Sequence, residues 1–378
     1  MARILMVASV DRHISTFHLP HIQRLVDQGH TVEVAALRTR TDLALPGVSA
    51  FWDVPFARNP ARIDTLRAYR RLRQVVRRGN YDIVHCHTPT ASALTRWACR
   101  SLRPGGLKVI YTAHGFHFFR GAPLLNWMVY YPLERYMARF TDVLITINQE
   151  DYERARGWKA GAVRKIPGIG VDIAAFANHQ GDRLGIRAAL SVPPEAFLLL
   201  SVGELNRGKN HSVIIQAMSR LHDERLHYAI AGEGSERGRL EALASSLGLL
   251  DRVHLLGRRD DIADLHRAAD AFCFPSLREG LAISPLEAMA SGVPVIASNV
   301  RGVRDYALDN QTALTVSPMD IDGFTCCIRE LMKDPGLRQS LVAAASQFIV
   351  SFSLARSMKA IEDVYAPLLV EHVSRKQG

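Results

Sequence analysis

The chain has 378 residues, of which 48% are hydrophobic and 22% charged, and its formal net charge is +10 at pH 7. The length exceeds what one ordinary domain needs, and the composition is that of a globular protein rather than a disordered one. No stretch of about twenty apolar residues lacks a charge, so we expect no transmembrane helix. The apolar run at residues 1–9 is too short for a signal peptide, and we expect none.

The net charge indicates the kind of partner that the chain binds, and the cysteines indicate the cellular compartment of the protein. An excess of Lys and Arg indicates an anionic partner, such as nucleic acid, anionic lipid or a phosphorylated substrate. The five cysteines form neither a metal-ligand spacing nor an even disulfide framework. We therefore expect buried, reduced thiols in a cytoplasmic protein.

Short apolar, β-rich runs alternate with helical patterns in the first half of the chain. We expect strands at residues 3–8, 31–37, 82–87, 108–114 and 142–147, and a helix at 19–28 that ends before Gly29. This alternation predicts a parallel sheet covered by helices on both faces. The Pro/Gly-rich stretch 166–172 predicts a linker between two domains.

A basic amphipathic helix is predicted around residues 62–78. Arginines crowd this segment and its approach: Arg58, Arg62, Arg67, Arg70, Arg71, Arg73, Arg77 and Arg78. Apolar residues recur within it at helical spacing: Leu66, Tyr69, Leu72, Val75 and Val76. The segment is either a solvated helix face or a surface that attaches to anionic lipid headgroups. Nucleic acid is not the expected partner, because aromatic and basic residues do not interleave in the sequence.

The second half repeats the same alternation. We expect strands at residues 197–202, 226–231, 252–256, 271–275 and 293–297, followed by a helical stretch at about 334–376. The fold class is therefore α/β, with two doubly wound parallel sheets. The glycines at 232 and 234 resemble a dinucleotide fingerprint, but Arg237 stands where its third glycine is needed. We expect no NAD and no other cofactor.

Two glutamates eight positions apart flank the start of a predicted helix. Ser284 is a suitable N-cap, Pro285 suits the first helical position, and Glu287 follows three residues after the cap. Gly280 lets the backbone approach a ligand, so the amides of Gly280, Leu281, Ala282 and Ile283 are expected to face an anion. The alternative is structural: Glu287 completes a capping box and Glu279 is a solvated loop acid.

This stretch resembles the E-x7-E signature of the retaining glycosyltransferases of family four. That family has the GT-B fold, in which two Rossmann-like domains face a central cleft. The resemblance implies a first, acceptor-side domain at residues 1–170 and a nucleotide-sugar-binding domain at 171–350, with a helix at 351–378 that crosses back to the first domain. It also implies that Glu279 contacts the donor sugar as a catalytic residue and that Glu287 holds the ribose.

The loop at residues 201–211 follows a predicted strand and precedes a helix. It carries two cations, Arg207 and Lys209, which could neutralise a diphosphate. Lys209 matches the lysine that holds the donor diphosphate in the family, but Glu204 stands where the family has an arginine. We expect Arg207 to replace that missing cation.

Histidines end predicted strands in the first half. The His114–Gly115 pair is similar to the family's H-G pair, which implies that His114 faces the donor sugar as a second catalytic residue. His87, and His13 in the loop after the first strand, are interpreted as acceptor-side residues. Each of these histidines could instead be structural.

The resemblance covers nearly the whole chain, and the segment 116–151 is similar to bacterial enzymes that assemble capsular or exopolysaccharide units. We therefore expect retaining transfer from a nucleotide sugar, a UDP-sugar in the first instance, to a lipid-linked sugar acceptor. No D-x-D motif lies near the donor loops, so we expect no metal site. The alternatives are a sugar-nucleotide epimerase of the same architecture and a non-catalytic nucleotide-sugar-binding regulatory subunit.

The expected location is the inner face of the cell membrane, with the chain bound peripherally. The basic helix would supply one contact. An apolar cluster would supply another unless it is an ordinary core face: Leu124, Leu125, Trp127, Met128, Tyr130 and Tyr131.

Overall fold

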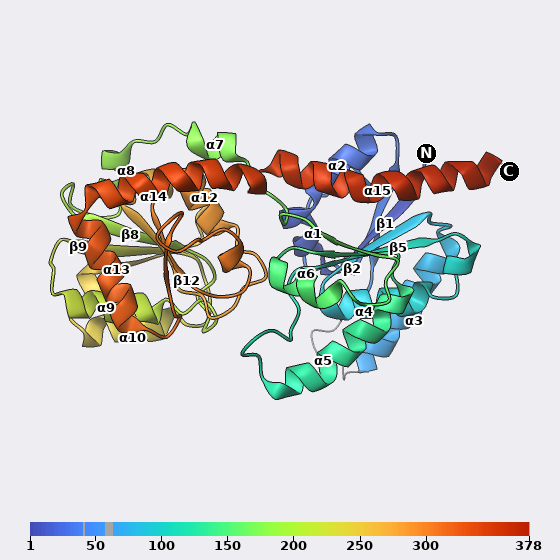
Figure 1. Cartoon of the computed structure of the whole chain (residues 1–378), viewed down its shortest axis with the longest axis horizontal. Helices are drawn as coiled ribbons and strands as arrows, with labels where there is room; N and C mark the ends of the chain where they lie inside the picture. The colour runs from blue at the N-terminus through green and yellow to red at the C-terminus, as the bar shows by residue number, and fades with distance from the viewer. Residues whose placement is uncertain (41, 57–62, 378) are drawn as a thin grey trace. The chain divides into compact units, whose positions relative to one another are not determined.

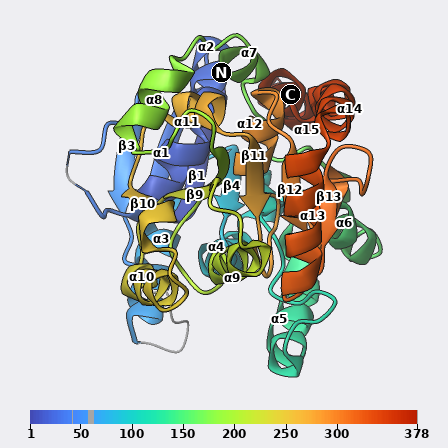
Figure 2. The same ribbon diagram turned by 90° about the vertical axis from the view of Figure 1, so that its left-hand side faces the viewer.

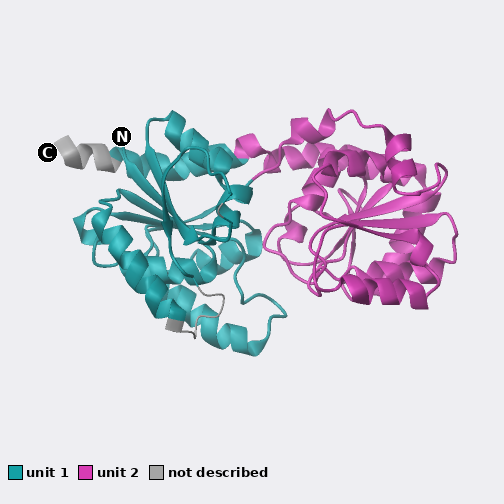
Figure 3. Cartoon of the chain, turned by 180° about the vertical axis from the view of Figure 1, so that it is seen from behind, with its two compact units in different colours: residues 1–169, 357–378 teal, residues 170–356 magenta. Residues whose placement is uncertain are grey.

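The computed structural model describes the backbone of residues 1–40, 42–56 and 63–377, and the side chains within 1–40, 42–56 and 64–370. Its contacts divide the chain into two compact units (Figure 3). One comprises Met1–Ile169 together with the segment from Ser357 on, and the other comprises Gly170–Arg356. The break after Ile169 falls within the Pro/Gly-rich stretch 166–172. The first unit is therefore discontinuous in sequence.

The first unit is built on a seven-stranded parallel sheet in the order β3-β2-β1-β4-β5-β6-β7. Its strands are β1 (Arg3–Val10), β2 (Thr31–Leu37), β3 (Val48–Asp53), β4 (Ile83–His87), β5 (Lys108–Ala113), β6 (Val143–Thr146) and β7 (Ala162–Lys165). The central strands are buried on both faces, which explains why their sequences are continuous apolar runs. The strand order reverses between β1 and β4, which makes the ends of these strands a topological switch point.

Helices cover both faces of this sheet (Figure 1). They are α1 (Asp11–Phe17), α2 (Leu19–Asp27), α3 (Ile63–Arg78), α4 (Pro89–Cys99), α5 (Leu124–Met137), α6 (Gln149–Ala155) and α15 (Leu354–Gln377). Helices α3, α4 and α5 pack on one face, where Leu5 and Val7 of β1 join their core. Helices α2 and α15 cover the other face, where Tyr365 of α15 donates to Met6 Sδ at 3.8 Å. Alternate residues of β1 thus contact opposite layers.

The second unit is a six-stranded parallel sheet in the order β10-β9-β8-β11-β12-β13. Its strands are β8 (Phe197–Val202), β9 (Leu226–Ala231), β10 (Val253–Gly257), β11 (Ala271–Phe274), β12 (Val295–Ser298) and β13 (Leu314–Val316). Its helices are α7 (Ile173–Ala177), α8 (Arg183–Ala189), α9 (Ser212–Leu221), α10 (Arg237–Ser246), α11 (Ile262–Ala268), α12 (Ser284–Ala290), α13 (Ile321–Lys333) and α14 (Pro335–Phe348). Helices α9, α10 and α13 pack on one face and α8, α11 and α12 on the other (Figure 2). The switch point of this sheet lies between β8 and β11.

The central strands and the edge strand β10 lie where the sequence predicts them, but the other three edge strands were not predicted. Strands β3, β7 and β13 lie at sheet edges, are partly exposed or short, and carry no long apolar run. The helical stretch expected at 334–376 consists of α14, a 3-10 turn at Ile349–Phe352 and α15. The turn lies where the backbone of Phe352 and Leu354 pairs with Val171. Among the cysteines, Cys86, Cys99 and Cys273 are buried, but Cys326 is exposed on α13.

Buried arginines join the helices to the sheets. Arg96 of α4 is fully buried, 2.8 Å from Glu134 of α5 and 4.1 Å from the Tyr111 ring centroid. Arg187 of α8 lies 2.5 Å from Asp270 and donates to the backbone carbonyls before β8. A buried ion pair tolerates poorly the loss of one partner, so these residues are structural anchors. In the described part of the chain, no helix is both long and apolar enough to cross a membrane.

Candidate functional site

The loops that follow β8 and β11 meet at the switch point of the second unit. These strands are hydrogen-bonded neighbours although they are far apart in sequence. The amide of Leu277 donates to the carbonyl of Gly208 at 2.8 Å, which ties the two loops together. Lys209 Nζ lies 2.8 Å from Glu279 Oε1 and 4.9 Å from the Phe274 ring centroid. The structure therefore brings together the predicted diphosphate lysine and the predicted sugar-binding glutamate.

Arg207 does not join this pair. Its side chain is 82% exposed, and Nε lies 3.4 Å from Glu236 Oε1. No hydrogen bond or ion pair among the described residues links it to Lys209 or Glu279. Glu204, at the position of the family arginine, is exposed. Of the two predicted diphosphate-binding cations, Lys209 thus pairs with Glu279 and Arg207 pairs with Glu236.

The start of α12 differs from the prediction. The helix begins at Ser284, the cap position is Ile283, and no side chain caps it, so the predicted N-cap at Ser284 is wrong. The reason is that Ile283 already has helical backbone angles (φ −86°, ψ −41°), and its carbonyl accepts a bond from the Glu287 amide at 3.0 Å. Ser284 thus lies inside the first turn. Because a capping box needs Ser284 at the cap position, the interpretation of Glu287 as the second residue of a capping box is also wrong.

Glu287 is instead a partly buried carboxyl without a described partner. No hydrogen bond or ion pair to its side chain occurs among the described residues. Burial raises the pKa of Glu287 from its ordinary value of 4.5 to about 7. A carboxyl with a raised pKa and no structural partner is a candidate ligand-binding group.

A third loop at the same sheet edge adds residues that the sequence did not predict. Arg301, after β12, is buried and donates from Nε to the backbone carbonyl of Glu279 at 3.2 Å. Gly302 has φ +76°, and a Cβ there would lie 2.1 Å from the carbonyl oxygen of Gly280. Only glycine fits this approach. The available signal was the Arg-Gly pair in the loop that follows the predicted strand 293–297, because parallel strands end at one edge of their sheet.

Tyr306 completes this side of the site. Its hydroxyl is buried and has no hydrogen-bond partner among the residues that the structure describes. Burial raises the pKa of Tyr306 well above its usual range, and the negative charge of Glu279 contributes to the rise. The hydroxyl therefore stays neutral close to Glu279.

Histidines gather at the switch point of the first unit. His13 lies in α1 directly after β1, His87 ends β4, and His114 follows β5. His87 Nδ1 and His114 Nε2 are 3.2 Å apart, and the ring centroids of His13 and His114 are 4.9 Å apart. The structure thus brings the three predicted histidines together. It also adds His18, which the sequence analysis missed and whose ring centroid is 3.9 Å from that of His87.

These histidines are neutral at physiological pH. Burial lowers the pKa of His13 to about 4, and burial together with the charge of His13 lowers the pKa of His114 to about 3. The pKa of His18 and that of His87 lie well below the usual range, again mainly because of burial. Neutral imidazoles offer a lone pair to a ligand and one N–H donor each.

The backbone beside the histidines is unusual. Thr88, directly after His87, has φ +64°, a conformation that is an outlier for a β-branched residue. Its hydroxyl oxygen accepts a bond from the Ser9 amide at 3.0 Å, which joins the ends of β4 and β1. Gly115, directly after His114, has φ +121°. Uncommon backbone conformations concentrate at ligand-binding sites.

Helix α3 carries the basic segment on its exposed face. The exposed arginines are Arg67, Arg70, Arg71, Arg73, Arg77 and Arg78, whereas Arg58 and Arg62 lie outside the described residues. The side chains of Ala68, Leu72, Val75 and Val76 are buried in the core, and Leu66 is exposed. The apolar face of α3 therefore packs mainly in the core of the first unit. Its arginines lie on the exposed face and are available to a partner.

The predicted apolar cluster on α5 divides in two. Trp127, Tyr130 and Tyr131 pack against the core of the first unit. Leu124, Leu125 and Met128 are exposed by 73%, 68% and 66%. Helices α3 and α5 both contact α4 and lie on the same side of the sheet (Figure 1). The exposed arginines and the exposed apolar residues thus occupy one side of this unit.

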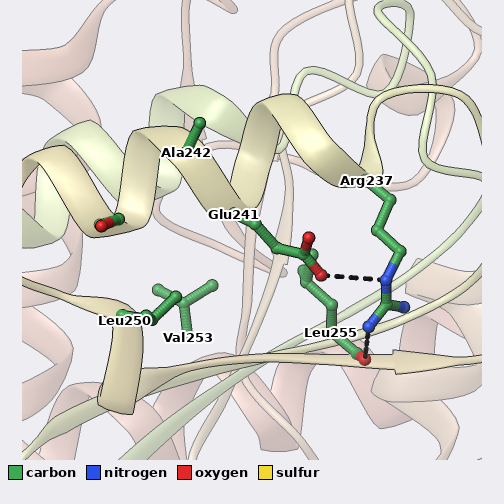
Figure 4. A pocket seen from close by; sticks show the side chains of 7 residues that line it. Arg237, Glu241, Ala242, Leu250, Val253 and Leu255 are labelled. Atoms are coloured by element: carbon green, nitrogen blue, oxygen red, sulfur yellow. Dashed lines mark hydrogen bonds and ion pairs between the residues drawn. The ribbon is translucent and has the colours of Figure 1, made fainter.

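A pocket of about 480 Å³ lies at the edge of the second unit, between α10 and β10 (Figure 4). Arg237 crosses it, 3.0 Å from Glu241 and 3.2 Å from the carbonyl of Leu255. It contains none of the predicted site residues. We therefore place the candidate site at the strand ends and not in this pocket.

Two family matches cover most of the chain. Residues 20–173 match "Glycosyltransferase Family 4", and residues 182–348 match "Glycosyl transferases group 1". The first match lies in the first unit and reaches four residues into the second. The second match lies wholly within the second unit.

Relatives extend over the full length. EpsD of Bacillus subtilis (strain 168), a candidate glycosyltransferase, is 37% identical over 369 residues, which is 96% of each chain. The UDP-Gal:alpha-D-GlcNAc-diphosphoundecaprenol alpha-1,3-galactosyltransferase of Escherichia coli is 28% identical over 87% of each chain.

Solved structures establish the fold. The Anabaena protein Alr3699/HepE, in complex with UDP and glucose, has a TM-score of 0.79 at 18% identity and covers 97% of this chain and 100% of its own. The sucrose-phosphate synthase of Thermosynechococcus elongatus has a TM-score of 0.78 at 20% identity, with 98% and 100% covered. The two parallel-sheet units are thus those of the GT-B fold. With the match to EpsD over almost its whole length, the chain belongs to the family 4 glycosyltransferases.

Proposed function

We propose that this glycosyltransferase moves a sugar, with retention of the anomeric configuration, from a UDP-sugar to a lipid-linked sugar acceptor in bacterial surface polysaccharide biosynthesis. The observation that carries the proposal is the pairing of Lys209 with Glu279 at the switch point of the second sheet. The E. coli relative names UDP-Gal as donor and a diphosphoundecaprenol-linked sugar as acceptor. The Anabaena structure is named as a complex with UDP and glucose.

The second unit would bind the donor. Lys209 would leave its 2.8 Å pair with Glu279 to neutralise the diphosphate, and Glu279 would then accept hydrogen bonds from the sugar hydroxyls. The backbone at Gly280–Ile283 would contribute amides, and Glu287 would bind the ribose. In this scheme the Lys209–Glu279 pair keeps both charges compensated while the site is empty. Exposed Arg207 is free to turn from Glu236 to the diphosphate, since its ion pair is solvent-exposed and weak.

The first unit would provide His114 for the sugar and His87 and His13 for the acceptor. Because burial keeps these rings neutral, they would act as hydrogen-bonding groups rather than as cations. The charge that develops on the leaving diphosphate would then be stabilised by Lys209 and the backbone amides. The leaving phosphate would take the acceptor proton.

The same unit would attach the enzyme to the membrane that carries its acceptor. The arginines of α3 would bind anionic headgroups, each adding about 1 kcal/mol close to the surface. Leu124, Leu125 and Met128 of α5 would enter the interface, where exposed apolar side chains gain most. This placement explains why one side of the unit combines positive charge with exposed apolar residues.

Transfer is tested with radiolabelled UDP-sugars and a bacterial lipid extract. Label should enter the lipid fraction only when the extract is present, and NMR coupling constants of the product should show the donor's anomeric configuration. Lys209→Ala should abolish label transfer, whereas Lys333→Ala, which removes an exposed lysine of the same unit, should not. Free isomerised sugar nucleotide without labelled lipid would contradict the proposal and indicate an epimerase.

A further inference from the structure

Four histidines of the first unit converge where β1, β4 and β5 end: His13, His18, His87 and His114. One ring nitrogen from each lies within 4.8 Å of the nitrogens offered by all the others. The side chains of His18 and His87 are 5% and 1% exposed. Among the described residues, Nε2 of His13 and Nε2 of His18 have no hydrogen-bond partner. Buried polar atoms are rarely left unpaired, so two of them in one place indicate a missing ligand.

We propose that these four histidines bind one zinc ion. Zinc prefers four ligands in a tetrahedron with Zn–N distances of about 2.0–2.1 Å, which places the ligand nitrogens about 3.3 Å apart. His87 Nδ1 and His114 Nε2, at 3.2 Å, already have this spacing. The remaining nitrogens, within 4.8 Å, reach it by small rotations of their rings.

The chemistry of the donor set favours zinc over magnesium or calcium. All four donors are imidazole nitrogens, which suit zinc and its transition-metal neighbours, whereas magnesium and calcium prefer oxygen. The nearby acid Asp11 is already engaged, because its Oδ2 accepts a bond from the Thr39 amide at 2.8 Å.

A second layer of side chains supports the cluster. His85 lies next to His87, with ring centroids 4.2 Å apart, but both of its nitrogens are occupied. Nδ1 is 2.9 Å from the Tyr365 hydroxyl and Nε2 is 2.8 Å from Thr112 Oγ1. His85 is thus a packing neighbour of the proposed ligands. Ordered groups around a metal site hold its ligands in position.

The proposed ion would join elements that come from separate parts of the chain. His13 and His18 lie on either side of the last turn of α1, and His87 and His114 end neighbouring strands. Zinc would therefore tie α1 and the start of α2 to the sheet. The proposal goes beyond sugar transfer: it replaces the expectation that the chain has no metal site, and it makes His13, His87 and His114 metal ligands in place of the direct contacts to sugar and acceptor given above.

Direct binding measurements on the full, untagged chain test this. After dialysis against a chelator, zinc chloride is added, excess metal is removed, and bound zinc is measured by mass spectrometry. We expect about one zinc per chain, and isothermal titration should give one strong site. Cobalt in place of zinc should give the intense visible absorption of a tetrahedral site.

Single substitutions assign the ligands. His18→Asn and His87→Asn should each weaken zinc binding by more than the 10- to 100-fold that the loss of an outer-layer partner causes. His227→Gln is the matched control, because it disrupts a close histidine pair outside the cluster, with His254 at 3.1 Å, and should keep one zinc. Circular dichroism of the metal-free variants checks that they fold.

The outcomes are separate from those of the transfer assay, because no substrate is needed. Wild-type protein that retains far less than one zinc would overturn the proposal. So would folded His18→Asn and His87→Asn variants that bind zinc as tightly as the wild type. A weak, octahedral cobalt spectrum would also contradict a four-histidine site.

Discussion

The substitution Glu287→Gln should stabilise the second unit at alkaline pH. Burial raises the pKa of Glu287 from 4.5 to about 7, so above pH 7 the folded chain holds a partly buried charge that the unfolded chain exposes to water. Each pKa unit corresponds to about 1.4 kcal/mol, which gives about 3 kcal/mol as an upper value. Partial exposure of the side chain reduces the expected gain to roughly 2 kcal/mol.

The gain should depend on pH in one direction. Between about pH 4.5 and pH 7 the folded state binds more protons than the unfolded state, so the stability of the wild type falls as the pH rises through this window. Glutamine carries no proton to lose. The variant should therefore match the wild type at about pH 4 and exceed it by the full amount at about pH 8.

The two units can be followed separately during urea unfolding. The four tryptophans, Trp52, Trp97, Trp127 and Trp158, all lie in the first unit. Tryptophan fluorescence should thus show an unchanged transition, while far-UV circular dichroism should show the shifted transition of the second unit. Glu224→Gln, which changes an exposed glutamate of the same unit, should alter stability by less than about 0.5 kcal/mol.

Two results would refute this reasoning. Equal stability of Glu287→Gln and wild type at about pH 8 would show that the carboxylate is not penalised by burial. An equal gain at about pH 4 and at about pH 8 would show that the effect is packing and not charge. Under the proposed function, the variant should also bind UDP more weakly, which isothermal titration measures independently.

Three further predictions concern charged side chains. Lys209→Ala should weaken UDP binding by about tenfold or more, because a charge-assisted hydrogen bond contributes about 1.5–3 kcal/mol; wild-type affinity by titration would contradict its role. Glu134→Gln should lower the unfolding free energy of the first unit by about 3–5 kcal/mol, because Arg96 keeps a buried charge without its partner; fluorescence-detected unfolding measures this, and a change below about 1 kcal/mol would contradict it. Replacing Arg70, Arg73 and Arg77 by glutamine should release the protein from anionic vesicles but not alter UDP binding, and sedimentation that persists on such vesicles would show that α3 is merely a solvated face.

The sequence predicted the centre of each sheet better than its edges. Strands such as β1 and β8 are buried on both sides, so they must be continuous apolar runs, and such runs are visible in a sequence. Strand β13 has three residues and pairs only with β12. It is a strand because of this pairing and not because of its own amino-acid composition. The break before α15 likewise depends on Val171, which is distant in sequence.

The candidate site was predictable in part for the same reason. Lys209 and Glu279 follow predicted neighbouring strands, so their meeting is a consequence of topology. Arg301 was missed although it lies in the loop after a predicted strand, and Tyr306 was missed because no local pattern records its burial close to Glu279. His18 was missed because it lies at the break between two short helices, and its approach to His87 is a purely tertiary contact.

Because the first unit is discontinuous in sequence, the ribosome synthesises its two segments before and after the second unit. Its sheet is complete by Ile169, but the helix that covers one face, with Tyr365 hydrogen-bonded to buried His85, is translated only after the whole second unit. A nascent chain therefore exposes that apolar face to solvent while the contiguous second unit can already fold. A stop codon just before Ser357 would remove no strand, yet the first unit would lack the part of helix α15 that covers one face of its sheet.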